Sequence, residues 1–287
     1  MRQYTIAGHT IKISGKRLDT LPGFNFFLSN KRDNKPLLAI NTEAALQDSP
    51  ISSFFTSKLG GANCDFSTVG NSYHFRIKED ENYLLTKIDP EVNSFYAKMQ
   101  LTGLCKDSWL YIACKLLFGI AALPCQTVSI HSSAVMIHGK SILFLGESGT
   151  GKSTQTGLWL NHLPNTELLN DDSPFIRVET DGNIRVYGSP WSGKTPCYKN
   201  ISTPIVAFVR LSQAPYNRIR RLKGAEAIGA LLPSFPFSLF HEKKLAESIY
   251  SIVSQTLRQT PVYHLECLPD AGAVELVYST LIQDRFL

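Results

Sequence analysis

The pattern of hydrophobic and polar positions changes character near residue 100. Before that point, short runs of β-branched, aromatic and aliphatic residues alternate with turn-forming residues, at positions 10–13, 24–28, 37–40 and 73–77. Runs of this kind, bounded by Gly, Asn, Asp and Ser, predict strands. We therefore expect residues 1–102 to form a β-rich N-terminal module.

Strands and helices are mixed in the remainder, residues 103–287. A helical run at 107–123 leads into two apolar runs, 133–137 and 141–145, whose separation by His138-Gly139-Lys140 predicts a hairpin. Further strands are predicted at residues 167–169, 175–178, 184–187, 205–211 and 262–268, and further helices at 152–162, 243–257 and 273–282. This mixture predicts an α/β domain with a mixed, partly antiparallel sheet.

Composition excludes disorder, because 43% of the 287 residues are hydrophobic and only 18% are charged. The length favours about two domains. The net charge of +5 is too small to indicate a polyanion partner, so no nucleic acid is expected. The one dense basic stretch, residues 218–223, is interpreted as an edge strand with a solvated cationic face.

Six cysteines are scattered without a C-x-x-C pair, so we expect reduced thiols. The N-terminal segment has no apolar core followed by a small-residue cleavage site, which favours a cytoplasmic protein. The most apolar run, residues 109–123, is interrupted by Lys115 and stopped by Pro124. We expect it to be a buried helix and expect no membrane association.

A glycine-rich segment between an apolar run and a predicted helix fits G-x-x-x-x-G-K-[ST] at every fixed position. Its glycines allow successive backbone N–H groups to face phosphate oxygens, and the following helix adds its positive N-terminal end. We expect Lys152 to reach the β- and γ-phosphates and the Ser153 hydroxyl to bind Mg²⁺. The alternative is a glycine turn that only opens a helix. The expected nucleotide-binding residues are Gly146, Glu147, Ser148, Gly149, Thr150, Gly151, Lys152, Ser153 and Thr154.

Two adjacent carboxylates, Asp171 and Asp172, end the next apolar run, nineteen positions after Lys152. That separation allows one helix and a return strand, which brings the carboxylates beside the phosphate loop. There, one carboxylate can hold Mg²⁺ while the other takes a proton from an acceptor. The alternative is an Asx-type turn. The sequence leaves open which aspartate is the base and which contacts the metal.

Four segments together resemble a known family. They are residues 131–135 (His-Ser-Ser-Ala-Val), 144–154 (Phe-Leu-Gly-Glu-Ser-Gly-Thr-Gly-Lys-Ser-Thr), 170–172 (Asn-Asp-Asp) and 188–194 (Gly-Ser-Pro-Trp-Ser-Gly-Lys). The chain resembles the catalytic domain of the HPr kinase/phosphorylase family, in particular its diverged relatives, with distant similarity to ATP-dependent phosphoenolpyruvate carboxykinases. The resemblance implies a P-loop domain of the HPr kinase/carboxykinase type, with ATP and Mg²⁺ as cofactors.

The resemblance also implies roles for two further residues. His131 would lie beside the γ-phosphate and assist Asp171 or Asp172 with the acceptor proton, whereas an isolated histidine would be a structural strand-edge residue. Lys194 would bring a cation to the transferring phosphoryl group, and the alternative is a solvated loop lysine. Members of this family form hexamers, so the resemblance implies a homo-oligomer.

These observations favour a Mg-ATP-dependent kinase that transfers the γ-phosphoryl group to a hydroxyl, in particular a serine of a small protein or peptide. Two alternatives remain open. One is a small-molecule kinase or carboxykinase-like enzyme with the same loop, and the other is a non-catalytic nucleotide-binding sensor or scaffold. The N-terminal module contains no recognisable motif, and recruitment of the acceptor is a hypothesis for its role.

Overall fold

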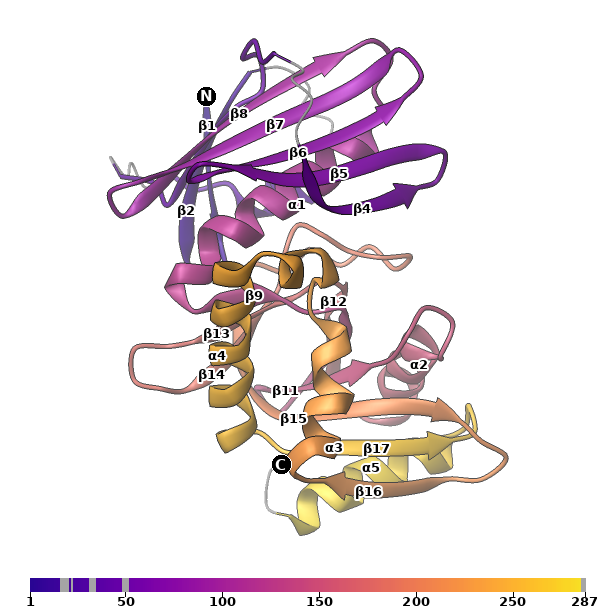
Figure 1. The fold of residues 1–287 in the computed structure, drawn as a ribbon. Helices are drawn as coiled ribbons and strands as arrows, with labels where there is room; N and C mark the ends of the chain where they lie inside the picture. Colours follow the sequence, from indigo (N-terminus) through magenta and orange to yellow (C-terminus); the bar gives the residue numbers. More distant parts are fainter. Residues whose placement is uncertain (16–20, 22, 31–34, 48–51, 285–287) are drawn as a thin grey trace. The chain divides into compact units, whose positions relative to one another are not determined.

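The chain is a mixed α/β protein with multi-stranded mixed sheets and a β-rich N-terminal region (Figure 1). The computed structural model describes residues 1–15, 21, 23–30, 35–47 and 52–284. Two compact units are formed, one by Met1–Cys125 with Ser238–Ala246 and the other by Gln126–Phe237 with Glu247–Leu287. The division falls later than the expected boundary at residue 102, because helix α1 (Asp107–Ala122) contacts strands β7 and β8 of the first unit.

The first unit contains an eight-stranded sheet in the order β1-β2-β3-β8-β7-β6-β5-β4. Strand β3 runs parallel to its neighbours β2 and β8, and every other pair is antiparallel. The strands are β1 (Arg2–Ile6), β2 (His9–Ser14), β3 (Leu38–Asn41), β4 (Ser53–Leu59), β5 (Ala62–Val69), β6 (Ser72–Glu79), β7 (Asn82–Glu91) and β8 (Ser94–Thr102).

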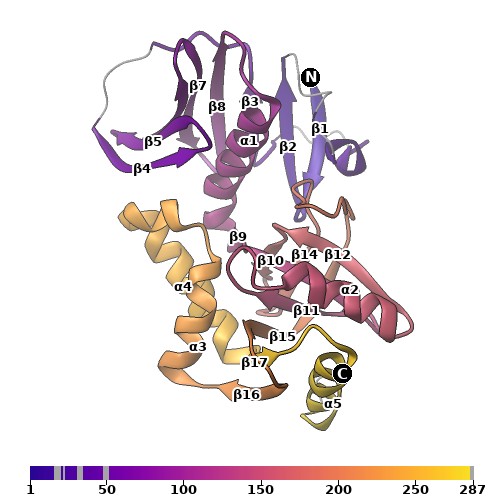
Figure 2. The same cartoon turned by 90° about the vertical axis from the view of Figure 1, so that its right-hand side faces the viewer.

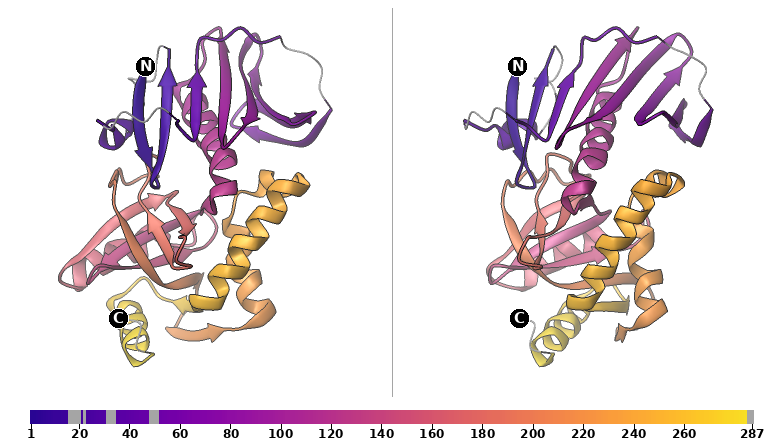
Figure 3. Two further views of the ribbon diagram at one scale, coloured as in Figure 1. Left: turned by 90° about the vertical axis from the view of Figure 1, so that its left-hand side faces the viewer. Right: turned by 60° about the vertical axis from the view of Figure 1, so that its left-hand side comes forward.

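One face of this sheet packs against α1 (Figure 3). Phe66, Ile77 and Leu84 are buried in the sheet, and Trp109 and Leu117 of α1 are buried as well. Alternation along a strand sends every second side chain to the opposite face. The other face of β5–β7 therefore carries polar side chains, and the core of this unit lies on the α1 side.

By length and composition alone, the 19-residue stretch Asp107–Cys125 is apolar enough to cross a membrane, with a mean hydropathy of 1.6. It comprises α1 and the short 3₁₀ turn η3 (Leu123–Cys125). In this structure most of its apolar window is buried in the protein. Such burial is what a core helix requires, and the absence of a membrane partner stays a prediction.

Three of the four strands expected in the first unit are confirmed, since residues 10–13, 37–40 and 73–77 fall mainly within β2, β3 and β6. The strand expected at 24–28 is wrong, because Phe24–Phe27 forms the 3₁₀ helix η2. Gly23 before it adopts a left-handed conformation (φ 89°), which turns the chain. Phe24 and Phe27, three residues apart, are both buried, as 3₁₀ geometry permits.

The second unit is built on a nine-stranded sheet in which β15 is the long central strand. The first part of β15 pairs with β14 in the order β15-β14-β13-β9, and the rest lies between β11 and β17, parallel to both. Strand β10 pairs with β11 and β12, and β16 pairs with β17. The strands are β9 (Thr127–Ser129), β10 (Ser132–Ile137), β11 (Lys140–Leu145), β12 (Thr166–Asp172), β13 (Phe175–Val178), β14 (Ile184–Tyr187), β15 (Ser202–Gln213), β16 (Arg218–Leu222) and β17 (Val262–Cys267).

Helices lie on both sides of this sheet (Figure 2). Helices α2 (Lys152–His162) and α5 (Ala271–Gln283) contact each other and share a core with the strands through Trp159, Val274 and Leu281. Helix α3 (Gly224–Leu231) and the part of α4 (Lys243–Gln259) that belongs to this unit, from Glu247 on, lie on the other side. Along the chain, the 3₁₀ turns η4 (Leu232–Ser234) and η5 (Phe237–His241) connect the two helices. The expected hairpin, the strands at 175–178 and 184–187 and the helix at 152–162 are confirmed.

The basic stretch at 218–222 is strand β16, which pairs only with β17 among the described strands. Arg218 and Arg220 are exposed and form ion pairs with Glu266 and Glu226. The expectation of an edge strand with a cationic solvated face is confirmed, with part of that charge paired locally.

Candidate functional site

Sheet register brings three chemically distinct segments to one edge of the second unit. Ser132, the first residue of β10, lies opposite Leu145 at the end of β11 and opposite Asp172 at the end of β12. The glycine-rich loop begins directly after Leu145, and His131 directly precedes Ser132. Strand pairing alone therefore collects the loop, the two carboxylates and His131 at the same edge.

The glycine-rich loop is curled by residues in left-handed or related conformations. Gly146, Gly149 and Gly151 have φ of 156°, 85° and 104°. A Cβ on Gly146 would lie 2.3 Å from Thr150 Oγ1, whose hydroxyl donates to the Glu147 carbonyl at 2.9 Å. Glycine is thus required for both conformation and space. The loop leads directly into α2, whose first-turn N–H groups make this end favourable for an anion.

The Lys152 ammonium is held inside this loop. Its Nζ donates to the carbonyls of Gly146 at 2.7 Å and Glu147 at 3.1 Å, and lies 3.0 Å from His131 Nε2. The side chain is only 9% exposed, and burial lowers the pKa of Lys152 against the opposing influence of Asp172 and Glu147. The loop therefore encloses a poorly solvated cation whose direct contacts are two carbonyls and an imidazole, and an anionic ligand would be stabilised there.

Asp171 is buried and accepts hydrogen bonds from three directions. Its carboxylate lies 2.6 Å from Ser133 Oγ, 3.3 Å from Ser153 Oγ and 3.3 Å from the Thr195 backbone nitrogen. Ser153 and Asp171 offer a hydroxyl and a carboxylate side by side, which is the hard oxygen donor set that Mg²⁺ prefers. The described residues contain no group of three or more His, Cys, Asp or Glu suited to a metal. An ion held here would complete its coordination with water and phosphate oxygens, as Mg²⁺ commonly does.

Asp172 has different surroundings. Its Oδ1 lies 3.3 Å from His131 Nδ1, and Ser173 Oγ donates to its other carboxylate oxygen. Its φ of 130° is unusual for a residue with a side chain and marks local backbone strain. The side chain is more than a third exposed, so one aspartate is buried among hydroxyls and the other faces solvent beside an imidazole. His131 in turn spans Asp172 and Lys152 through its two ring nitrogens.

Asn170 fixes the loop formed by residues 188–197 onto the end of β12 that carries Asp171 and Asp172. This side chain is fully buried, and its Nδ2 donates to the carbonyls of Trp191 at 3.1 Å and Ser189 at 3.3 Å. The Gly193 N–H donates to the Asp171 carbonyl, and a Cβ on Gly193 would come within 2.8 Å of that oxygen. Glycine thereby permits a close backbone approach that holds the loop over the acids.

The remaining expected residues occupy the rim. Ser148 and Thr154 are exposed, on the loop and in the first turn of α2 respectively. Lys194 is exposed next to Gly193 and makes no hydrogen bond or ion pair with any residue that the structure describes. Trp191 is buried against Phe175, with ring centroids 5.7 Å apart, so it serves the core.

Two residues at the site have no clear sequence signal for the positions they occupy. Asn170 was part of the Asn-Asp-Asp segment, but its role in fixing residues 188–197 depends on strand packing. Arg210 lies opposite Leu145 in the register of β15 and β11, and its Nη2 is 2.9 Å from Glu147 Oε1. The positions of both residues at the site depend on which strands pair, and the sequence alone does not give this pairing. Arg177, on β13, pairs with Glu179 and is not part of this group of residues.

Comparison with known proteins gives no family assignment. No family model matches the chain, and no curated protein matches it. Functional interpretation therefore rests on the geometry and chemistry of the residues at this edge of the sheet.

Proposed function

We propose that the second unit is a P-loop domain of the HPr kinase/carboxykinase type that transfers the γ-phosphoryl group of Mg-ATP to a hydroxyl. The observation that carries the proposal is the position of the Lys152 ammonium inside a glycine-rich loop, with the Ser153–Asp171 oxygen pair beside it. Phosphoryl transfer needs mainly positioning and neutralisation of negative charge. A buried cation, N–H groups at the start of α2 and a carboxylate–hydroxyl pair supply these elements.

The surroundings of the two aspartates support a division of labour. Asp171, buried between Ser133 and Ser153, is assigned to hold Mg²⁺ together with the Ser153 hydroxyl. The ion would neutralise charge on the phosphate oxygens when bound. Asp172, exposed beside His131, is assigned as the general base. We assign the base to Asp172 because its side chain is more exposed than that of Asp171, and an acceptor hydroxyl must come within hydrogen-bonding distance of the base.

In the proposed reaction, the acceptor oxygen forms a bond to the γ-phosphorus while the bond from that phosphorus to the bridging oxygen breaks. The acceptor proton goes to the Asp172 carboxylate, and His131 orients this carboxylate through the 3.3 Å contact. Lys152 leaves the carbonyls of Gly146 and Glu147 to contact the phosphates. Lys194, exposed on the adjoining loop, is assigned to bring a cation to the γ-phosphate. The acceptor class favoured is a serine hydroxyl of a small protein or peptide.

The test replaces each aspartate separately. D172N is expected to keep Mg-ATP binding in calorimetry and to lose label transfer from γ-labelled ATP to a lysate component by about 100-fold or more, the usual contribution of a general base. D171N is expected to lose the Mg²⁺ dependence of nucleotide binding, because a metal contact is removed. The matched control is D181N, in the exposed turn between β13 and β14.

Each alternative gives a different result. Label that appears on a metabolite rather than on protein identifies a small-molecule kinase or carboxykinase-like enzyme. Mg-ATP binding without label transfer by the wild-type chain identifies a nucleotide sensor. If the wild-type chain binds no Mg-ATP, the nucleotide assignment itself is wrong.

A further inference from the structure

A separate cavity of about 700 Å³ lies on the side of the second sheet that carries α3 and α4 (Figure 2). Its walls come from the end of β16, from α3, from the second half of α4 and from the start of β17. All of these residues belong to the second unit, and none belongs to the glycine-rich loop or the acid pair. The volume falls in the range of about 300–1,000 Å³ that is usual for binding sites. The cavity is therefore a candidate binding site that the proposed phosphoryl transfer does not use.

The cavity has a continuous apolar lining that is only partly covered. Leu222 and Val253 are 7% and 4% exposed, whereas Ile228 on α3 and Tyr250 on α4 are 45% and 51% exposed. Single exposed apolar side chains are ordinary, but large ones grouped around a hollow are typical of interaction sites. A ligand in this cavity would remove both Ile228 and Tyr250 from water.

The charged groups at the cavity are all cations. Arg221, Lys223 and Arg258 line it, and among the described residues its lining includes no Asp or Glu. The side chains of Lys223 and Arg258 are exposed and form no ion pair within the described ranges of the chain. The apolar lining is therefore bordered by positive charge, and an acidic ligand complements it.

The rest of the basic stretch is partnered differently. Arg218 and Arg220 pair with Glu266 and Glu226, and neither arginine lines the cavity. Cations of β16 that lie away from the cavity are thus neutralised by the protein's own carboxylates. Lys223, at the cavity, is not.

We infer that the cavity is the docking site for an acidic, amphipathic helix of a partner protein. The apolar stripe of this helix packs against Ile228, Tyr250 and Val253. Its carboxylates lie beside Lys223 and Arg258. A helix suits the site because two of the walls are themselves helices, between whose side chains an apolar stripe can pack.

The test is a peptide-display selection on the wild-type chain, with a random library of peptides about 15 residues long, enough for a helix of about four turns. Enriched peptides are expected to carry large apolar residues at positions i, i+3, i+4 and i+7, with Asp or Glu between them. Fluorescence anisotropy then measures the affinity of an enriched peptide. I228D should weaken it at least about tenfold, because a carboxylate replaces an apolar contact. The matched control is I201D, since Ile201 is also 45% exposed but lies outside the cavity.

A second pair of variants tests the charge. K223Q/R258Q should weaken the peptide about fivefold or more, and this difference should shrink at high salt. R218Q/R220Q removes the same net charge from arginines that already have carboxylate partners, so it should change the affinity less than about twofold. Urea unfolding checks that each variant is folded.

Selection of no peptide, or of basic peptides, would overturn the inference. So would enriched peptides that bind I228D as tightly as the wild-type chain. If sedimentation velocity shows a wild-type dimer that I228D dissociates, a second copy of the chain occupies the cavity and the partner assignment is wrong. None of these results bears on Mg-ATP binding, so the inference and the proposed function fail independently.

Discussion

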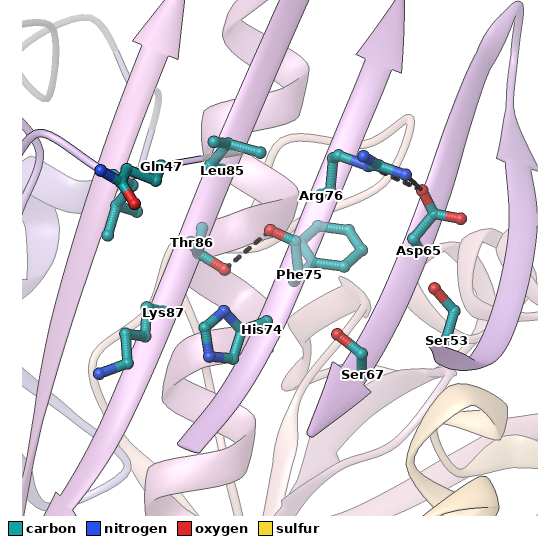
Figure 4. A pocket seen from close by; sticks show the side chains of 11 residues that line it. Gln47, Ser53, Asp65, Ser67, His74, Phe75, Arg76, Leu85, Thr86 and Lys87 are labelled. Atoms are coloured by element: carbon teal, nitrogen blue, oxygen red, sulfur yellow. Dashed lines mark hydrogen bonds and ion pairs between the residues drawn. The ribbon is translucent and has the colours of Figure 1, made fainter. Parts of the chain in front are cut away.

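Each unit carries charged side chains on or beside its sheet, and the two units differ in how these charges are partnered. On the open face of the first sheet, a cavity of about 170 Å³ lies over β5, β6 and β7 (Figure 4). Arg76 forms two hydrogen bonds to Asp65 Oδ2, at 2.7 and 2.9 Å, and Lys87 pairs with Asp89 at 2.9 Å. Each of these cations thus has a carboxylate on the same strand or the next.

In the second unit, Lys152 contacts two backbone carbonyls and an imidazole, and none of the ion pairs among the described residues includes it. The carboxylates of the first unit pair directly with its cations, whereas Lys152 has no carboxylate in direct contact and is favoured in its charged form by Asp172, Glu147 and Asp171 only from a distance. A cavity alone therefore does not indicate a ligand. The stronger indication is a buried cation whose direct contacts include no carboxylate.

The largest effect on Mg-ATP binding is expected for a substitution of Lys152. K152M should weaken Mg-ATP binding by at least about 30-fold, because loss of one member of a buried charge pair costs about 2–5 kcal/mol. R76M should leave that affinity unchanged, since Arg76 pairs with Asp65 in the other unit. Calorimetry measures both. If K152M and the wild-type chain bind Mg-ATP with equal affinity, Lys152 does not differ in this respect from the paired cations of the first unit.

Lys152 also predicts a pH dependence of stability. Burial lowers the pKa of Lys152 below its ordinary value of 10.5 in the folded chain, so the native state releases this proton at a lower pH than the unfolded state does. The unfolded state then binds more protons, and stability rises with pH in that interval. The cost of burying the charge is present in full at neutral pH and is relieved as pH rises toward 10.5. Urea unfolding of the wild-type chain, compared with K152M, should show this relative gain.

The sequence predicted the second unit better than the first for a physical reason. The glycine-rich motif, the Asp-Gly turn at 181–182 and the 152–162 helix are local signals, and their elements appear at the expected positions. In the first unit, strands β1, β4, β5, β7 and β8 were not predicted. Strand β5, for example, places Asn63 and Asp65 on the open face between buried residues, so its apolar content is low. Only pairing with neighbouring strands stabilises such a segment.

The same reason limits prediction of the site. The glycine-rich loop with Lys152 is one short segment and the acid pair is another. The nineteen positions between Lys152 and Asp171 allow one helix and a return strand, so the proximity of the two segments could be expected from the sequence. The separate surroundings of Asp171 and Asp172 depend on Ser133 and His131, which reach the carboxylates across paired strands. The fixing of residues 188–197 by Asn170 likewise requires the packed structure.

The second effect in size concerns Asn170. N170D keeps the side-chain volume but replaces a donor by a carboxylate facing the carbonyls of Ser189 and Trp191. A buried group left without a partner costs about 1–3 kcal/mol, and we expect destabilisation at the upper end of this range in urea unfolding. The variant N200D, at an exposed position, should change stability by less than about 0.5 kcal/mol. If N170D is as stable as the wild-type chain, these hydrogen bonds do not fix the loop.

The smallest effect is expected for His74, which, unlike Arg76 and Lys87, has no carboxylate in direct contact among the described residues. His74 lines the polar cavity, and its Nε2 is buried without a hydrogen-bond partner among the described residues. Burial, reinforced by Lys87 and opposed by Asp89, lowers the pKa of His74 below its ordinary value of 6.5. As pH falls below that value, the unfolded chain takes up the proton first, so His74 reduces stability progressively in acid. H74Q removes this titration and should lose less stability than the wild-type chain below pH 6.5.

The matched control for that experiment is H162Q, at the exposed end of α2, measured by urea unfolding at the same pH values. Equal acid sensitivity of H74Q and the wild-type chain would mean that a protonated His74 is accommodated on the open face, where Asp89 favours its charged form. In that case the open face of the first sheet stabilises the charge of His74 even though its Nε2 has no hydrogen-bond partner among the described residues. Lower acid sensitivity in H74Q alone would instead make His74 the one titrating group of that cavity whose charge the neighbouring strands do not neutralise.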